Sequence, residues 1–228
     1  MRFPRPLVRI PVLTLLVAAL WPLAPAEAQE HACNDTAKLA RLRAPLFHMA
    51  RRVAADRPLT ILALGSSSTA GAGASGPAAS YPSRLAVELK TLFPDLPVTV
   101  LNRGANGEEA ADMLARFEQG AATDKPDVVL WQLGTNSVLR DRPLGHYEEI
   151  IRQGLARMKA LGADVVLIDP QFAPKVIARP EAEDMVSLIA AAATKRGVDL
   201  FPRFAIMRAW HETEAIPFEG FLRRTSSI

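Results

Sequence analysis

The stretch LTILALGSSST, residues 59–69, joins an apolar run to a turn of small polar residues. Its first part, Leu59–Leu64, shows little alternation of polar and apolar positions, which is typical of a strand buried on both faces. The glycine and serines that follow are common turn residues. The stretch therefore predicts a central strand that ends in a polar loop.

The same arrangement recurs along the chain. Further apolar runs occupy Val98–Leu101, Val128–Leu133, Val165–Ile168 and Val198–Phe201. Helical composition lies between and before them, over Asp35–Ala54, Tyr81–Phe93, Glu108–Gln119, His146–Leu161 and Pro180–Arg196. Gly162 and Gly197 stand where a left-handed residue would end a helix. Alternating strands and helices predict an α/β fold, a three-layer, doubly wound, five-stranded parallel sheet in one domain.

Ligands of open parallel sheets bind beyond the carboxyl ends of the strands, so the residues after each run carry the functional information. These are GSSST at 65–69, NRGANG at 102–107, GTN at 134–136 and DPQ at 169–171. Turns use small polar residues in any protein, so one such loop has little meaning. The ordered set is more specific.

This set resembles the sequence blocks of SGNH (GDSL-type) hydrolases, from about Leu59 to about Gly220. The resemblance implies a flavodoxin-like fold, with strand one between strands two and three, and makes Ser67 the nucleophile. It makes the Gly107 amide and the Asn136 side chain donors to the oxyanion. Ser66 stands where the family usually has Asp, which leaves some choice among three adjacent serines.

Ester cleavage suits these residue types. The carbonyl oxygen gains negative charge in the tetrahedral intermediate, and donors fixed in advance stabilise it. The amides of Ser67 and Gly107 and the side chain of Asn136 could supply three. The alternatives are structural: Ser67 as a helix cap, Gly107 as a turn residue and Asn136 as the start of an Asx-turn.

A serine nucleophile also needs a base and a group that orients the base. The family takes both from a late D-x-x-H block, and these 228 residues contain none. Among the histidines, His31, His48, His146 and His211, the last is the best substitute, although a surface helix histidine is the simpler interpretation. We expect the chain as written to be nearly inactive.

The last six residues, RRTSSI, permit a test from the genetic code. They can be encoded CGC CGG ACG AGC TCC ATA, followed by TGA. With one T restored before them, the same bases translate as Ser-Pro-Asp-Glu-Leu-His-Met, which contains D-x-x-H. The hypothesis is a one-base deletion that truncated the domain, and nucleotide sequencing across codons 220–228 and beyond would decide it.

The N-terminus reads as a secretory signal peptide over residues 1–28. Three arginines precede the apolar stretch Ile10–Leu20, and Ala26-Glu27-Ala28 offers a cleavage site. A membrane anchor is the alternative. We expect a secreted or periplasmic protein without stable membrane insertion, with a helical segment over 29–56 and the hydrolase-like domain over 57–228. Cleavage would lower the net charge from +3 to +1, because 24 basic residues would face 23 acidic ones.

No cofactor, metal or nucleic acid is expected. The run Gly71–Gly76 spells G-x-G-x-x-G but neither begins at the strand end nor opens a helix, so we interpret it as a lid. The lone Cys33 cannot form an internal disulfide. The sequence predicts a serine hydrolase acting on small carboxylic esters, such as acyl or carbohydrate acetyl esters. The alternative is a non-catalytic protein that binds acylated glycans.

Overall fold

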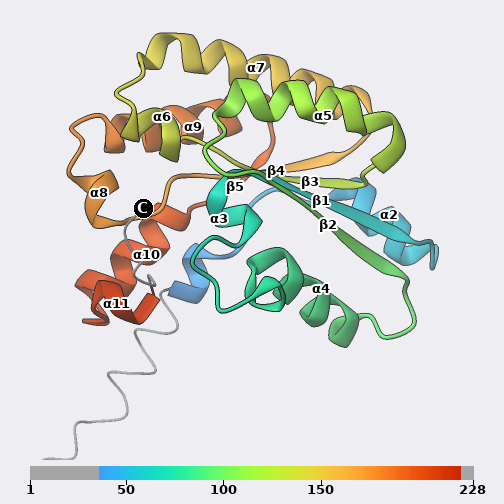
Figure 1. Ribbon diagram of the computed structural model, residues 1–228. Coiled ribbons are helices and arrows are strands. Elements are labelled where there is room, and N and C mark those ends of the chain that lie inside the picture. The colour runs from blue at the N-terminus through green and yellow to red at the C-terminus, as the bar shows by residue number, and fades with distance from the viewer. Residues whose placement is uncertain (1–35, 222–228) are drawn as a thin grey trace, which may run out of the picture.

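The five apolar runs form one parallel sheet in the computed structural model, which describes residues 36–221 (Figure 1). The strand order is β2-β1-β3-β4-β5, so the first strand lies between the second and third, and the predicted fold class is confirmed. The strands are β1 (Leu59–Gly65), β2 (Val98–Gly104), β3 (Val128–Gln132), β4 (Asp164–Ile168) and β5 (Asp199–Phe201).

Helices cover both faces of the sheet and gather at its carboxyl edge (Figure 1). One face carries α5 (Ala110–Asp124), α7 (Leu144–Ala160) and α9 (Ala182–Arg196), and the other carries α2 (Phe47–Ala54) and α4 (Tyr81–Leu92). At the carboxyl edge lie α3 (Ser67–Ala70), α6 (Thr135–Leu139), α8 (Pro174–Ile177) and α10 (Arg203–Glu212). The shorter helical segments include a 3-10 turn (Pro77–Ala79) and α11 (Phe218–Phe221).

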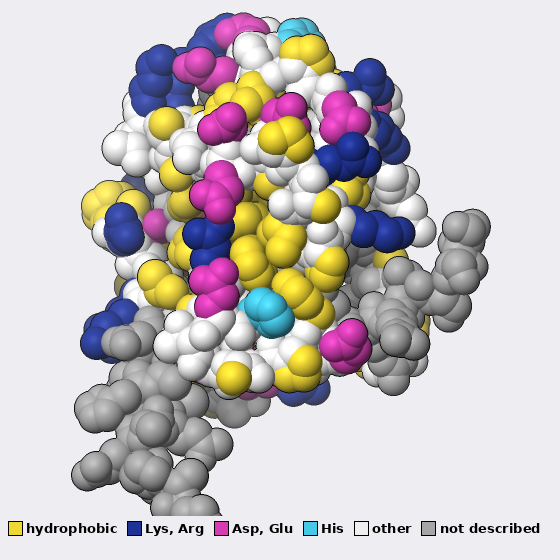
Figure 2. Space-filling view, turned by 90° about the vertical axis from the view of Figure 1, so that its left-hand side faces the viewer, with side chains coloured by type: hydrophobic (Ala, Val, Ile, Leu, Met, Phe, Trp, Pro, Cys, Tyr) yellow, Lys and Arg dark blue, Asp and Glu magenta, His cyan; other side chains and the backbone are white. Residues whose placement is uncertain are grey.

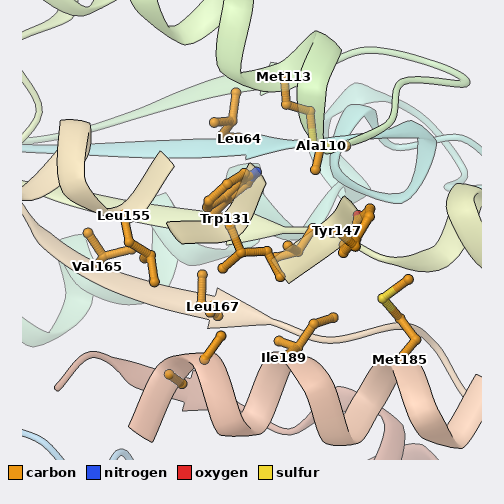
Figure 3. Close-up of a cluster of buried hydrophobic side chains, with 14 of the residues drawn as sticks. Leu64, Ala110, Met113, Trp131, Tyr147, Leu155, Val165, Leu167, Met185 and Ile189 are labelled. Carbon is orange, nitrogen blue, oxygen red and sulfur yellow. The ribbon is translucent and has the colours of Figure 1, made fainter. Parts of the chain in front are cut away.

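The main core lies between the sheet and the layer of α5, α7 and α9 (Figure 3). Trp131 of β3 is fully buried at its centre, next to Leu64 of β1 and Leu167 of β4. Gly154 lets α7 approach this ring, because a Cβ there would lie 2.3 Å from Cη2 of Trp131. Close packing of one helix against one large ring thus fixes the height of α7 above the sheet.

Replacing Gly154 by alanine should therefore destabilise the fold by about 1–3 kcal/mol, because the buried ring would have to move. Gly145, in the same helix, is the matched control, since a Cβ there meets no atom within 4 Å. Gly145→Ala should change stability by no more than about 1 kcal/mol, in the stabilising direction. Urea unfolding of both variants measures the difference, and equal effects would contradict this view of the core.

Two local predictions were wrong and one was right. The predicted helix over 35–54 is interrupted across residues 40–46, where Pro45 cannot continue a helix; Asp35 itself lies outside the described residues. Strand β2 runs on to Gly104 and is half-exposed along most of its length, because it forms an edge of the sheet. Gly162 and Gly197 do take left-handed conformations, with φ of 80° and 58°.

Aspartates at the amino ends of three strands hold the segment before β1. Asp127 binds Nε2 of His48 at 2.8 Å. Asp164 accepts from the Met49 amide at 2.9 Å, and Asp199 from the Ala44 amide at 2.8 Å. Helix α2 and the segment before it are therefore attached to the amino edge of the sheet, which is opposite to the predicted site.

Residues 1–28, with their expected signal peptide, and Cys33 lie outside the described residues. Within residues 36–221, every helix is too short or too polar to cross a bilayer.

Candidate active site

The three residues predicted for catalysis lie on three loops at the carboxyl edge of the sheet. Ser67 begins α3 directly after β1, and Asn136 is the second residue of α6, after β3. Gly107 lies between β2 and α5 with φ of 77°. Figure 2 looks onto this side of the molecule, where hydrophobic side chains gather in the middle and charged side chains flank them.

Hydrogen bonds tie the three loops together. The Ala105 amide donates to the carbonyl of Gly65 at 3.0 Å, which joins the second loop to the end of β1. Nδ2 of Asn136 donates to the carbonyl of Glu108 at 2.7 Å, which joins the third loop to the second. Gly104 completes the contact, because a Cβ there would lie 2.1 Å from the Ala70 amide nitrogen in α3. Only a glycine permits this approach.

The three adjacent serines differ in their surroundings. Ser66 is buried, and its hydroxyl donates to Oε1 of Gln132 at 3.2 Å. The Ser68 hydroxyl donates to the same oxygen at 3.1 Å and accepts from Arg203 at 3.1 Å. Ser67 is half-exposed, and its hydroxyl makes no hydrogen bond to any residue that the structure describes. Of the three, Ser67 has the hydroxyl available to a ligand.

Gln132, the last residue of β3, holds the serine turn through hydrogen bonds to its side-chain oxygen. Its Oε1 also accepts from the Ser66 amide at 3.1 Å and from the Thr69 hydroxyl at 3.2 Å. Because an amide N–H can only donate, it fixes which end of the Gln132 side chain faces the turn. The neutral Ser66 hydroxyl is compatible with this orientation, because it can donate to the same Gln132 oxygen.

Arg203, at the start of α10, connects the remaining strand ends. Its Nε donates to the carbonyl of Asp169 after β4, and Nη1 donates to the Ser68 hydroxyl, both at 3.1 Å. Nη2 donates at 3.1 Å to Oε1 of Gln171, which also accepts from the Thr135 hydroxyl at 3.2 Å. The Arg203 guanidinium thus joins the loops after β1, β4 and β5 directly. It reaches the loop after β3 through Gln171.

Burial changes the ionisation of this network. Removal from water raises the pKa of Asp169 to about 7, although the Phe204 amide donates to it at 2.8 Å and Arg203 is close. Burial also lowers the pKa of Arg203 to about 10. Oδ2 of Asp169 is buried without a hydrogen-bond partner in the described part of the chain. Burial therefore disfavours the charged form of both Asp169 and Arg203.

Ion pairs brace the loop that carries Gly107. Arg140, just after α6, binds Oε1 of Glu109 at 2.7 Å and the carbonyl of Gly107 at 2.8 Å. The Ser137 hydroxyl donates to the other oxygen of Glu109 at 3.2 Å. Partial burial acts to raise the pKa of Glu109, but the hydrogen bonds from Arg140, Arg142 and Ser137 outweigh it and hold this pKa below its usual value.

None of the described histidines is hydrogen-bonded to Ser67. His48 binds Asp127 at the opposite edge of the sheet, and His146 is exposed near the start of α7. His211 contacts the Ile216 carbonyl through Nδ1 at 3.1 Å and stacks on the Phe218 ring, with centroids 4.0 Å apart. It lies in α10, is partly exposed and packs among aromatic rings. His31 lies outside the described residues.

The sequence analysis missed Gln132, Arg203 and Arg140. Gln132 carried a usable signal, since it is a polar residue within the apolar run Val128–Leu133 and a buried amide needs hydrogen-bond partners. Arg203 follows the fifth apolar run, so the rule applied to the other four strand ends would have found it. Arg140 follows GTN by four residues, with no pattern that sets it apart from other surface arginines.

Two hollows of the surface lie away from this cluster. One, of about 280 Å³, is lined by residues of β1, β2 and α5, and the other, of about 330 Å³, lies between α9 and α10. Neither is lined by Ser67, Gly107 or Asn136. Residues 36–221 contain no group of three or more His, Cys, Asp or Glu side chains placed to hold a metal ion.

Solved structures with a similar fold include an SGNH hydrolase. AlinE4, an SGNH-hydrolase family esterase, superposes with a TM-score of 0.61 at 22% identity, over 75% of this chain and 86% of its own. TesA gives a TM-score of 0.53 at 26% identity, over 62% of this chain and 76% of its own. A catalytic mutant of Axe2, an acetylxylan esterase from Geobacillus stearothermophilus, gives 0.55 at 21% identity, over 62% and 74%. The fold is therefore that of an SGNH hydrolase.

The chain belongs to the non-GDSL lipase-like family, whose model matches residues 32–226. The first block, GSSST instead of G-D-S-x-T, agrees with that description. An acetylxylan esterase of Geobacillus stearothermophilus is 31% identical over 94 residues, which are 37% of this chain and 43% of that enzyme. The matched part thus spans less than half the length of this relative.

Proposed function

We propose that this protein hydrolyses small carboxylic esters, with Ser67 as the nucleophile. Ser67 Oγ would attack the ester carbonyl and lose its proton to a base. The alcohol would leave with that proton, and water would then release the acyl group from Ser67 as a carboxylic acid. The relatives are ester hydrolases, which supports this class of reaction.

The oxyanion would lie among three N–H donors. The Ser67 and Gly107 amides donate to no acceptor within the described residues, so both could serve a ligand. Asn136 uses one N–H for the Glu108 carbonyl, which orients the amide group and leaves its second N–H available. Donors held in place in this way stabilise negative charge without reorganising during the reaction.

A single observation carries the proposal. Of three adjacent serines, only Ser67 has a hydroxyl without a partner in the described chain, and it stands on a loop hydrogen-bonded to the one that carries Gly107. The internal hydrogen bonds of Ser66 and Ser68 oppose a nucleophilic role for either.

The activity of the 228-residue polypeptide is proposed to be low. Without a base, serine is a weak nucleophile, and the described histidines do not bind Ser67. The donors and binding alone leave about a thousandfold or more over the uncatalysed rate in a serine protease whose triad is removed. Residual turnover of this order is expected here.

Acetyl esters of carbohydrates are the proposed substrates, because a relative by sequence and a neighbour by structure are both acetylxylan esterases. The leader-like residues 1–28 support a secreted or periplasmic location, where a polymeric glycan is accessible.

The test is acetate release from p-nitrophenyl acetate and from acetylated xylo-oligosaccharides, measured at high enzyme concentration. Ser67→Ala should lower the rate of acetate release to the level that the donors and binding supply alone, because it removes the attacking oxygen. Ser66→Ala and Ser68→Ala, matched in size and position, should retain measurable release. Equal rates for Ser67→Ala and the unmodified chain would refute the proposal.

A second candidate is a non-catalytic protein that binds acylated glycans. The lack of a histidine bonded to Ser67 in the described chain favours it. This candidate predicts that calorimetry detects binding of acetylated xylo-oligosaccharides and that no acetate is released. The affinity of Ser67→Ala should equal that of the unmodified chain.

A further inference from the structure

The peptide around Gly107 has little of its own to hold it in place. Gly107 is exposed and left-handed, and a Cβ at this position would meet only the Arg140 guanidinium, at 3.5 Å. A glycine without close neighbours can adopt many conformations. Within the loop, a long hydrogen bond of 3.5 Å from the Glu108 amide to the Ala105 carbonyl closes the turn around Gly107, so a well-fixed N–H direction needs further support from outside the loop. On the amino side, the Ala105 amide is bound to Gly65.

Arg140 supplies the fixed point on the carboxyl side. Its Nη2 binds the Gly107 carbonyl at 2.8 Å while its Nη1 binds Glu109 at 2.7 Å. The planar guanidinium can span a carbonyl and a carboxylate at once, which the single ammonium of lysine cannot do in the same geometry. Asn136 fixes the next carbonyl, that of Glu108.

We propose that Arg140 is a positioning residue, which locks the backbone of Gly107 so that its N–H points to the oxyanion. The inference rests on the proposed function, since it assigns the Gly107 amide a part in ester cleavage. Arg140 does not touch the reacting atoms and acts through Gly107.

Arg142 provides a matched control. Its Nε binds the same oxygen of Glu109 at 3.2 Å, and its side chain is 58% exposed against 45% for Arg140. Among the residues that the structure describes, Arg142 makes no hydrogen bond to Gly107. Arg140→Met and Arg142→Met therefore remove the same charge and one bond to Glu109 each, and differ in the bond to Gly107.

The first readout is independent of activity. In protein labelled with ¹⁵N-glycine, the Gly107 amide of Arg140→Met should show a changed chemical shift and a reduced heteronuclear NOE, because its backbone becomes mobile. The amide in Arg142→Met should match that of the unmodified chain. An unchanged Gly107 signal in Arg140→Met, or the same change in both variants, would overturn the inference.

The second readout is the rate at which a fluorophosphonate labels Ser67. Misplacing one donor should lower the maximal labelling rate of Arg140→Met by about tenfold to a hundredfold, with little change in the half-saturating concentration. Arg142→Met should label normally. A weaker half-saturation at an unchanged maximal rate, or a lower melting temperature in Arg140→Met alone, would show a binding or purely structural role instead. Failure of Ser67 to label in every variant would count against the proposed function, and the Gly107 signal would still decide the role of Arg140.

Discussion

Replacing residues 223–228 by Ser-Pro-Asp-Glu-Leu-His-Met should raise kcat for p-nitrophenyl acetate by about a thousandfold or more, because a base of a serine triad contributes up to about a millionfold in a studied protease. The segment is the one that the shifted reading frame would encode with the synonymous codons chosen above, and it contains the D-x-x-H of the SGNH blocks. The described histidines do not bind Ser67, so a new base would meet no competitor in residues 36–221.

Two versions of the replaced segment are the controls. Ser-Pro-Asp-Glu-Leu-Ala-Met removes the base and should return kcat to that of the unmodified chain. Ser-Pro-Asn-Glu-Leu-His-Met keeps the base but loses the carboxylate that orients it, and should lie between the two. A rate increase that survives loss of the histidine, or no increase at all, would contradict the reading-frame hypothesis.

Asn136→Ala should lower the rate of ester cleavage by about 100- to 1000-fold, the range measured for one oxyanion donor elsewhere. The loss has two physical parts. The N–H proposed for the oxyanion disappears, and so does the 2.7 Å bond that holds the Glu108 carbonyl. Both act on the transition state, so kcat should fall while KM changes little.

Ser137→Ala is the neighbouring control for this variant. Ser137 also binds the second loop, through Glu109 at 3.2 Å, but offers no proposed donor to the oxyanion. Initial rates with p-nitrophenyl acetate, alongside melting temperatures, separate the two cases. Similar losses of kcat in both variants would mean that Asn136 only supports the loop.

The parts of the fold that the sequence predicted were the continuous apolar runs and the longer segments of helical composition. The buried strands appeared as runs such as Leu59–Leu64 and Val128–Leu133, because both faces of a central parallel strand need apolar residues. The helices α3 and α6 did not appear, because four or five residues contain no helical period. Strand β2 was underestimated because an edge strand tolerates residues such as Arg103.

For the site, the sequence predicted the candidate catalytic residues but not the residues that hold their loops in place. Ser67, Gly107 and Asn136 were found because they follow strand ends in an ordered set of blocks. Gln132 and Arg203 could have been singled out as a polar residue in an apolar run and as a strand-end residue, but the partners that they meet across the sheet are not encoded by spacing along the chain. The roles of the three predicted residues in catalysis stay predictions that the variants above test.

The position of the adduct formed by a fluorophosphonate is the most direct test of Ser67 as the residue that attacks the substrate. Peptide mapping of the labelled 228-residue chain should place the phosphonate on Ser67 alone, with Ser66 and Ser68 unmodified. An adduct on either neighbour, or on a serine far from the carboxyl edge of the sheet, would contradict the assignment.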